Sequence, residues 1–180
     1  MFKNSKAFRK GSAFEEMVEQ HFILKGYQPF SANQGGKHLI DWFMVNKETG
    51  VQIWVDAKAY TPMNDGGYLV TGINLTHYHD YQRLNRQSKN ALWIVFGDHE
   101  ERMAYGETFD NLEPYIFPDD RNGYAVLKPS PYLLKGNTGM KVMWHRSRFR
   151  DLFPLSDEQC AILASLSKEK PCFQPSLLEG

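Results

Sequence analysis

Residues 91–96 constrain the fold more than any other part of this sequence. They read Ala-Leu-Trp-Ile-Val-Phe, an unbroken apolar run. Because successive residues of a strand point to opposite faces of its sheet, such a run requires cover on both faces. The chain is therefore expected to build a sheet with packed layers on both sides, which is an α/β architecture.

The segments before this strand supply the other elements of such a fold. Between Gly11 and Gly26, apolar residues recur at helical spacing, which predicts an amphipathic helix. Three strands are expected next, at 28–33, 38–45 and 51–60, followed by a turn-rich loop at 62–67. A polar helix is expected at 74–90, with Asn74 at its N-cap. Beyond Gly97 the pattern predicts an acidic loop, short strands at 124–127 and 140–144, and a helix that begins at Ser156.

Charged residues interrupt two of the expected strands. In segment 51–60, alternation places Asp56 and Lys58 on the face opposite the aliphatic row. Asp41 lies in the otherwise apolar segment 38–45, where an unpaired buried carboxylate would cost several kcal/mol or shift its pKa. We therefore expect Asp41, Asp56 and Lys58 to converge on neighbouring strands.

These residue types favour phosphodiester chemistry. Carboxylate oxygens suit a hard cation such as Mg²⁺ or Mn²⁺, which polarises a phosphodiester and helps to generate a hydroxide nucleophile. A lysine can orient the water or offset developing charge. Glu15 lies on the flank of the first helix's apolar face, from which it can reach the sheet, whereas Glu16 points further outward. The alternatives are a structural ion pair on the strands and, for Glu15, a solvated surface carboxylate.

Three short motifs occur in this order along the chain: Lys10-Gly11-Ser12-Ala13-Phe14-Glu15, Ile40-Asp41 and Val55-Asp56-Ala57-Lys58-Ala59. Together they resemble the PD-(D/E)xK nuclease superfamily, and within it most of all the archaeal-type Holliday-junction resolvases. Ile40 stands where the motif has proline, and Asp56 stands where the resolvases typically have glutamate. The resemblance implies a restriction-endonuclease-like αβββαβ core with a mixed central sheet. We expect a single nuclease domain over 1–180, with its core at about 11–97 and a C-terminal extension of short strands and a helix.

The resemblance also implies the site and the activity. Glu15, Asp41, Asp56 and Lys58 would be the catalytic residues, and the metal ligands would be Asp41, Asp56, the Ala57 carbonyl and Glu15. The expected cofactor is Mg²⁺, for which Mn²⁺ would substitute. The implied function is that of a DNA endonuclease on branched substrates such as Holliday junctions. A homodimer is the assembly that the resemblance implies. The alternatives are a restriction-, repair- or phage recombination-type nuclease on duplex DNA, and a nucleic-acid-binding module without catalysis.

The charge distribution is compatible with a DNA partner. The chain has 21 basic and 21 acidic residues, which argues against a uniformly basic coat. The basic residues nevertheless cluster in an N-terminal arm and in segment 128–150. The polar side of helix 74–90 is either solvated or faces DNA, and loop 31–38 is either a connector or lies near the scissile phosphate. The expected DNA contacts are Arg9, Lys10, Ser31, Lys37, Arg83 and Arg86.

The remaining residues with metal or redox chemistry favour ordinary roles. His77 and His79 point apart on a helix, and His21 is expected to be a core histidine. Cys160 and Cys172 are expected to be reduced thiols in a cytoplasmic protein. No apolar run reaches the roughly 18 residues of a membrane span, and residues 1–10 lack the apolar segment of a signal peptide. We therefore expect an intracellular protein without membrane association.

Overall fold

The computed structural model describes residues 6–32, 39–60, 62–65, 68–113, 125–129 and 140–167. Its elements, in chain order, are α1 (Lys6–Leu24), β1 (Tyr27–Ser31), β2 (Trp42–Asn46), β3 (Gln52–Lys58), β4 (Met63–Asp65), β5 (Tyr68–Asn74), α2 (Leu75–Gln87), β6 (Ala91–Asp98), β7 (Met103–Thr108), α3 (Phe109–Leu112), β8 (Ala125–Pro129), β9 (Met140–His145), the 3-10 turn η2 (Arg146–Arg148), β10 (Arg150–Pro154) and α4 (Asp157–Ser167).

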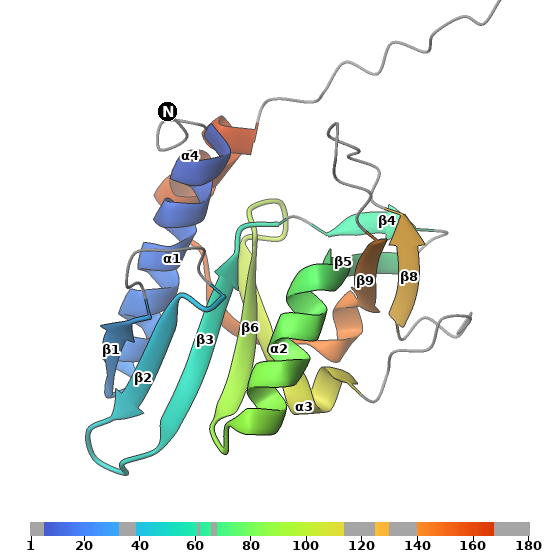
Figure 1. Cartoon of the computed structure of the whole chain (residues 1–180). Coiled ribbons are helices and arrows are strands. Elements are labelled where there is room, and N and C mark those ends of the chain that lie inside the picture. The colour runs from blue at the N-terminus through green and yellow to red at the C-terminus, as the bar shows by residue number, and fades with distance from the viewer. Residues whose placement is uncertain are drawn as a thin grey trace, which may run out of the picture.

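A six-stranded mixed sheet forms the centre of the molecule (Figure 1). Its strand order is β1-β2-β3-β6-β7-β10. The pair β3–β6 is parallel, whereas the other neighbours are antiparallel. The order α1-β1-β2-β3-α2-β6 confirms the expected αβββαβ core, with β4 and β5 added between β3 and α2.

Both faces of β6 are covered, as its apolar sequence predicts. Val95 packs with Phe14 of α1 in one cluster, which Leu163 of α4 completes. Ile94 belongs to a second cluster with Tyr81 of α2, and this cluster includes residues from α3, β5 and β9. The helices α1 and α4 therefore lie on one face of the sheet, and α2, α3 and the sheet β4-β5-β9-β8 lie on the other.

Two glycines fix the position of α1. Gly26 has φ +85° and lies just beyond the last residue of the helix, in a backbone conformation that favours glycine. Gly97 lies against the ring of Phe14, because a Cβ atom at this position would stand 2.4 Å from the ring carbon Cε2. The absence of a side chain at Gly97 therefore lets α1 approach β6 closely.

Two of the expected boundaries near the site were wrong. The helix α1 begins at Lys6, ahead of Gly11. The strand β2 begins at Trp42, so Asp41 precedes the strand instead of lying within it. The reason is local, because the carboxylate of Asp41 accepts the Ala57 N–H at the place where a longer β2 would offer a backbone carbonyl.

The expectation of a loop at 62–67 was also wrong, because β4 occupies residues 63–65 and pairs with β5. The strand β5 also pairs with β9, which lies far along the chain and leaves no signal in the local pattern. Similarly, the expected acidic loop beyond Gly97 contains β7, which joins β10 in the main sheet. Glu107 of β7 is buried there because Arg150 of β10 donates two hydrogen bonds to its carboxylate, at 2.8 and 3.0 Å.

The expected N-terminal positions of two helices were confirmed. Asn74 occupies the N-cap position of α2 with an extended backbone, although its side chain makes no capping hydrogen bond. Ser156 caps α4, since its Oγ accepts the Gln159 N–H at 3.2 Å while its own N–H donates to Gln159 Oε1 at 2.8 Å. Half-buried His21 stacks on Phe153. No helix within the described ranges is long and apolar enough to cross a membrane.

Candidate active site

Asp56 and Lys58 form the centre of the candidate site, at the C-terminal end of the strand β3. They lie two residues apart, so both point to the face that α2 covers. Asp56 is 1% exposed, and the Lys58 Nζ lies 2.7 Å from its Oδ2. The hydroxyl of Tyr81 on α2 donates to the same oxygen at 2.6 Å. A buried carboxylate is thus held by two donors from different elements.

Asp41 lies next to this pair because of its bond to β3. Its Oδ2 accepts the N–H of Ala57 at 2.8 Å, and Ala57 lies between Asp56 and Lys58 in the chain. Burial and the neighbouring charge of Asp56 raise the pKa of Asp41 from 3.8 to about 7, against the opposing effects of Lys58 and the Ala57 N–H. The carboxyl group of Asp41 is therefore close to half-ionised at neutral pH.

The other two groups remain protonated. Burial lowers the pKa of Lys58, but the charges of Asp56 and Asp41 outweigh this effect, so that its pKa is raised. Burial and the charge of Asp56 raise the pKa of Tyr81 well above its ordinary value. Lys58 is consequently a cation, and the hydroxyl of Tyr81 a donor, throughout the physiological range.

Glu15 reaches the site from α1. Its side chain is half-buried, and its charge contributes to the raised pKa of Asp41, whereas Glu16 is exposed. Glu15 is thus near enough to Asp41 for its charge to act there, and its role as a ligand stays a prediction. The four residues that the motifs single out come from α1, from the residue before β2 and from β3. The charges of Glu15, Asp56 and Lys58 all act on Asp41, so the fold brings the four residues near one another.

The donor set fits a hard divalent cation. Among the described residues, no three His, Cys, Asp or Glu side chains form a group that could hold a metal by themselves. Asp41 and Asp56 are nevertheless oxygen donors whose mutual repulsion is visible in the pKa of Asp41, and a cation would relieve that repulsion. Mg²⁺ is commonly bound by one or two carboxylates together with waters and substrate phosphates. The Ala57 carbonyl and Glu15 are the further groups of this chain that could contribute.

The sequence did not reveal two residues of α2 that lie at the site. Tyr81 is fully buried and bonds Asp56, but its position on the apolar side of the helix marks only a core residue. A buried tyrosine hydroxyl needs a hydrogen-bond partner, and this requirement could have indicated a polar partner for Tyr81. His77 is half-buried near Asp56 and Lys58. Burial and the charge of Lys58 lower the pKa of His77, while the charge of Asp56 opposes this.

The expected DNA contacts lie at several places. Exposed Arg83 pairs with Asp80, and exposed Arg86 lies 3.7 Å from Glu113. The helix α1 contains Arg9 and Lys10; burial lowers the pKa of Lys10, while the charges of Asp98 and Glu100 oppose this. Ser31 is exposed at the end of β1, and Lys37 lies outside the described residues. These assignments remain predictions.

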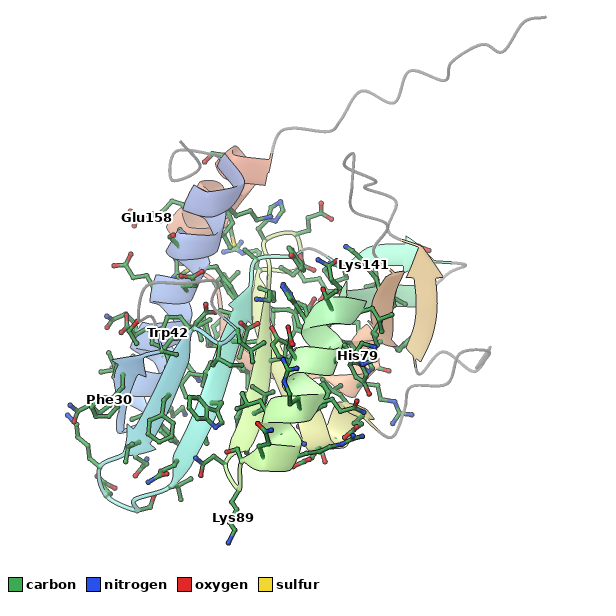
Figure 2. All side chains as sticks on the ribbon, viewed as in Figure 1. Phe30, Trp42, His79, Lys89, Lys141 and Glu158 are labelled. Carbon is green, nitrogen blue, oxygen red and sulfur yellow. The ribbon has the colours of Figure 1, made fainter. Side chains whose placement is uncertain are left out.

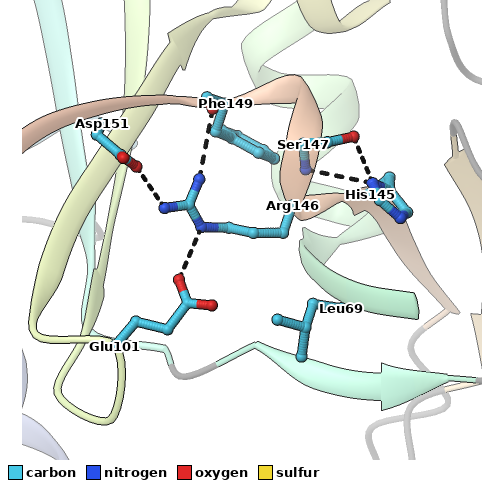
Figure 3. Close-up of a pocket in the computed structure, with 7 residues that line it drawn as sticks. All are labelled: Leu69, Glu101, His145, Arg146, Ser147, Phe149 and Asp151. Carbon is cyan, nitrogen blue, oxygen red and sulfur yellow. Dashed lines mark hydrogen bonds and ion pairs between the residues drawn. The ribbon is translucent and has the colours of Figure 1, made fainter. Parts of the chain in front are cut away.

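A pocket of about 570 Å³ lies away from these residues, and Figure 3 shows its lining. Arg146 crosses it, with its guanidinium 3.8 Å from the centre of the Tyr105 ring. The same guanidinium lies 2.5 Å from Asp151 and 3.4 Å from Glu101. Two carboxylates therefore neutralise this cation within the protein. The lining residues are Leu69, Glu101, His145, Arg146, Ser147, Phe149 and Asp151.

No protein-family model and no curated protein matches this sequence. Several solved structures resemble it, including the following two. One is Hjc, a Holliday junction resolvase from Archaeoglobus fulgidus, with 8% identity and a TM-score of 0.47 over 77% of this chain and 90% of that chain. The other is a nuclease from a fusselovirus, with 10% identity and a TM-score of 0.49 over 87% of this chain and 93% of that chain.

Proposed function

We propose that this chain is a metal-dependent endonuclease that hydrolyses phosphodiester bonds of DNA. The observation that carries the proposal is the coupling of Asp41 and Asp56 beside the ammonium of Lys58. Perturbed ionisation that combines burial with specific charge partners is typical of functional sites. A structural ion pair would need one carboxylate for one lysine, and it would not explain a second carboxylate whose pKa is raised to about 7.

Each residue has a role that its contacts support. Asp41 and Asp56 would hold Mg²⁺, with the Ala57 carbonyl and Glu15 as further ligands directly or through water. A cation held there would polarise the phosphodiester and would support deprotonation of the attacking water. Lys58 stays protonated, so it orients the water and offsets charge on the phosphate instead of accepting a proton.

The substrate that we propose is branched DNA, on the strength of the resemblance in the three motifs. Duplex DNA would be the substrate if the chain acts as a restriction-, repair- or recombination-type nuclease. The basic residues Arg9, Lys10, Arg83 and Arg86 would contact phosphates, which contribute affinity and register but no sequence preference. A homodimer would place two such sites on two strands.

The test is cleavage of labelled four-way junction, flap, single strand and duplex, each with Mg²⁺ or with EDTA. Wild type should cut at least one substrate in Mg²⁺ and none in EDTA. Asp56→Asn and Lys58→Met should each reduce the rate about a hundredfold or more, the size typical of a lost electrostatic group. Glu16→Gln is the matched control, because Glu16 is an exposed carboxylate one residue from Glu15, and it should cut like wild type.

The proposal fails if no substrate is cut in a metal-dependent way. It also fails if Asp56→Asn and Lys58→Met, shown to be folded by circular dichroism, cut as fast as wild type.

A further inference from the structure

Three aromatic side chains form a row across β1, β2 and β3. In the strand register Phe30 is the partner of Phe43, and Phe43 is the partner of Trp54. Their ring centroids are 6.4 and 4.8 Å apart. We call Phe30, Phe43 and Trp54 the aromatic row.

The aromatic row is accessible on the face of the sheet that carries the candidate site. Phe30 is 47% exposed and Phe43 is half-buried. Trp54 is half-buried against the cluster that contains Tyr81, and its indole N–H donates to Ser88 Oγ at 2.9 Å. On this face α2 lies over β6, whereas no element within the described ranges lies over β1 and β2 (Figure 1). Figure 2 shows Phe30 at the outer edge of the sheet, away from His79 on α2.

The aromatic row runs alongside the carboxylates. Asp56 follows Trp54 by two residues of β3, so this carboxylate shares a strand face with the Trp54 ring. Asp41 lies beside Asp56 because its Oδ2 accepts the N–H of Ala57. Two residues along a strand span about 6.6 Å. A phosphate at Asp41 and Asp56 would therefore have the aromatic row within the reach of the adjoining nucleotide.

The other flank of the aromatic row has two side-chain amides, Gln28 and Gln52, on either side of their register partner Val45. Gln28 and Gln52 are exposed on the same strand face, and Asn90 donates to Gln52 Oε1 at 3.4 Å. The face thus presents carboxylates with a lysine, then rings, then side-chain amides. The core of a protein–protein interface is a broader apolar patch depleted of charge. A nucleotide has a phosphate, a planar base and a hydrogen-bonding base edge, and these match the three rows in order.

We infer that the aromatic row is a stacking subsite for unpaired bases next to the phosphate that is cut. The inference rests on the proposed function for the identity of that phosphate. Bases inside a continuous duplex are stacked on each other and cannot offer their planes to Phe30. The substrate class is therefore DNA with unpaired nucleotides beside the cleavage position, whether at a branch or in a single strand.

The test separates the base from the phosphate. The intact chain is titrated, in EDTA so that nothing is cut, into a labelled oligothymidine and into the same oligonucleotide with abasic sites throughout. Wild type should bind the oligothymidine at least about fivefold more tightly, since stacking of one base on an aromatic ring changes affinity by about fivefold to a hundredfold. Phe30→Ala should lose most of this ratio, while its affinity for the abasic strand stays unchanged.

Two further variants make the result specific. Phe30→Trp restores a ring and should restore the ratio. Ile162→Ala removes a side chain of comparable exposure on α4, which lies on the opposite face, and should keep the wild-type ratio. Because Phe30 is exposed, its replacement should leave the thermal midpoint near that of wild type.

The inference is overturned if Phe30→Ala weakens both oligonucleotides equally or weakens neither. It is also overturned if Phe30→Ala dissociates a dimer of the free chain and leaves the base dependence unchanged, because a second copy would then occupy this face. Failure of the proposed function has a different signature, which is absence of metal-dependent cleavage together with intact, Phe30-dependent preference for bases in EDTA.

Discussion

Replacing Asp41 with asparagine should stabilise the metal-free protein while removing a proposed metal ligand. Burial and Asp56 raise the pKa of Asp41 from 3.8 to about 7. At about 1.4 kcal/mol for each tenfold change in equilibrium, ionised Asp41 costs the fold up to about 4 kcal/mol. Asparagine is neutral, and its side-chain oxygen can still accept the N–H of Ala57. The variant therefore removes the charge and keeps the hydrogen bond.

The raised pKa of Asp41 determines the direction of the stability change and the pH range in which it occurs. The folded state keeps the Asp41 proton at pH values where the unfolded state has lost it, so this cost grows from about pH 4 to about pH 7 and is constant above. Stability in EDTA is measured by urea denaturation near pH 5 and near pH 8. The gain in unfolding free energy of Asp41→Asn over wild type should be larger near pH 8 by about 1–3 kcal/mol.

The exposed control Glu16→Gln should change the unfolding free energy by less than about 0.5 kcal/mol at both pH values. The reasoning is refuted if Asp41→Asn is less stable than wild type near pH 8, or if its gain does not grow between the two pH values.

Three other predictions concern the same site and its surroundings. Tyr81→Phe should lower the unfolding free energy by about 1–3 kcal/mol, because a hydrogen bond to buried Asp56 is lost, and should lower kcat with little change in KM; denaturation and steady-state kinetics check this. Cleavage should increase as the pH rises through about 7, since the ionised form of Asp41 binds the cation, and more Mg²⁺ should move the midpoint of the pH–rate profile lower. Replacing Arg83 and Arg86 together by alanine should weaken DNA binding and flatten its dependence on salt, whereas an unchanged slope in titrations at several salt concentrations would assign this helix face to solvent.

The parts of the fold that depend on neighbouring residues could be predicted from the sequence. The apolar run at 91–96 predicts cover on both faces, and β6 has it. Alternation along 51–60 places Asp56 and Lys58 on one face, and the two side chains are paired. Both inferences depend only on the two-residue period of a strand.

The parts that depend on distant residues could not be predicted. The strand β5 pairs with β9, which follows α2, β6, β7, α3 and β8 in the chain, and the local sequence before β5 is typical of a turn. The local sequence predicts that Glu107 is an acidic loop residue. In the structure it lies in a strand and accepts a hydrogen bond from Arg150, which is far along the chain. In the site, the hydroxyl of Tyr81 gains its role only from the approach of α2 to β3, which no local pattern encodes.

The most direct test of the account is Mn²⁺ binding by the free protein, followed by electron paramagnetic resonance with Mg²⁺ as competitor. The account predicts that wild type binds Mn²⁺, that Mg²⁺ displaces it, and that Asp41→Asn and Asp56→Asn each weaken binding at least about tenfold while Glu16→Gln does not. Binding by both aspartate variants with wild-type affinity, or no binding by wild type, would contradict the claim that these two carboxylates hold the catalytic cation.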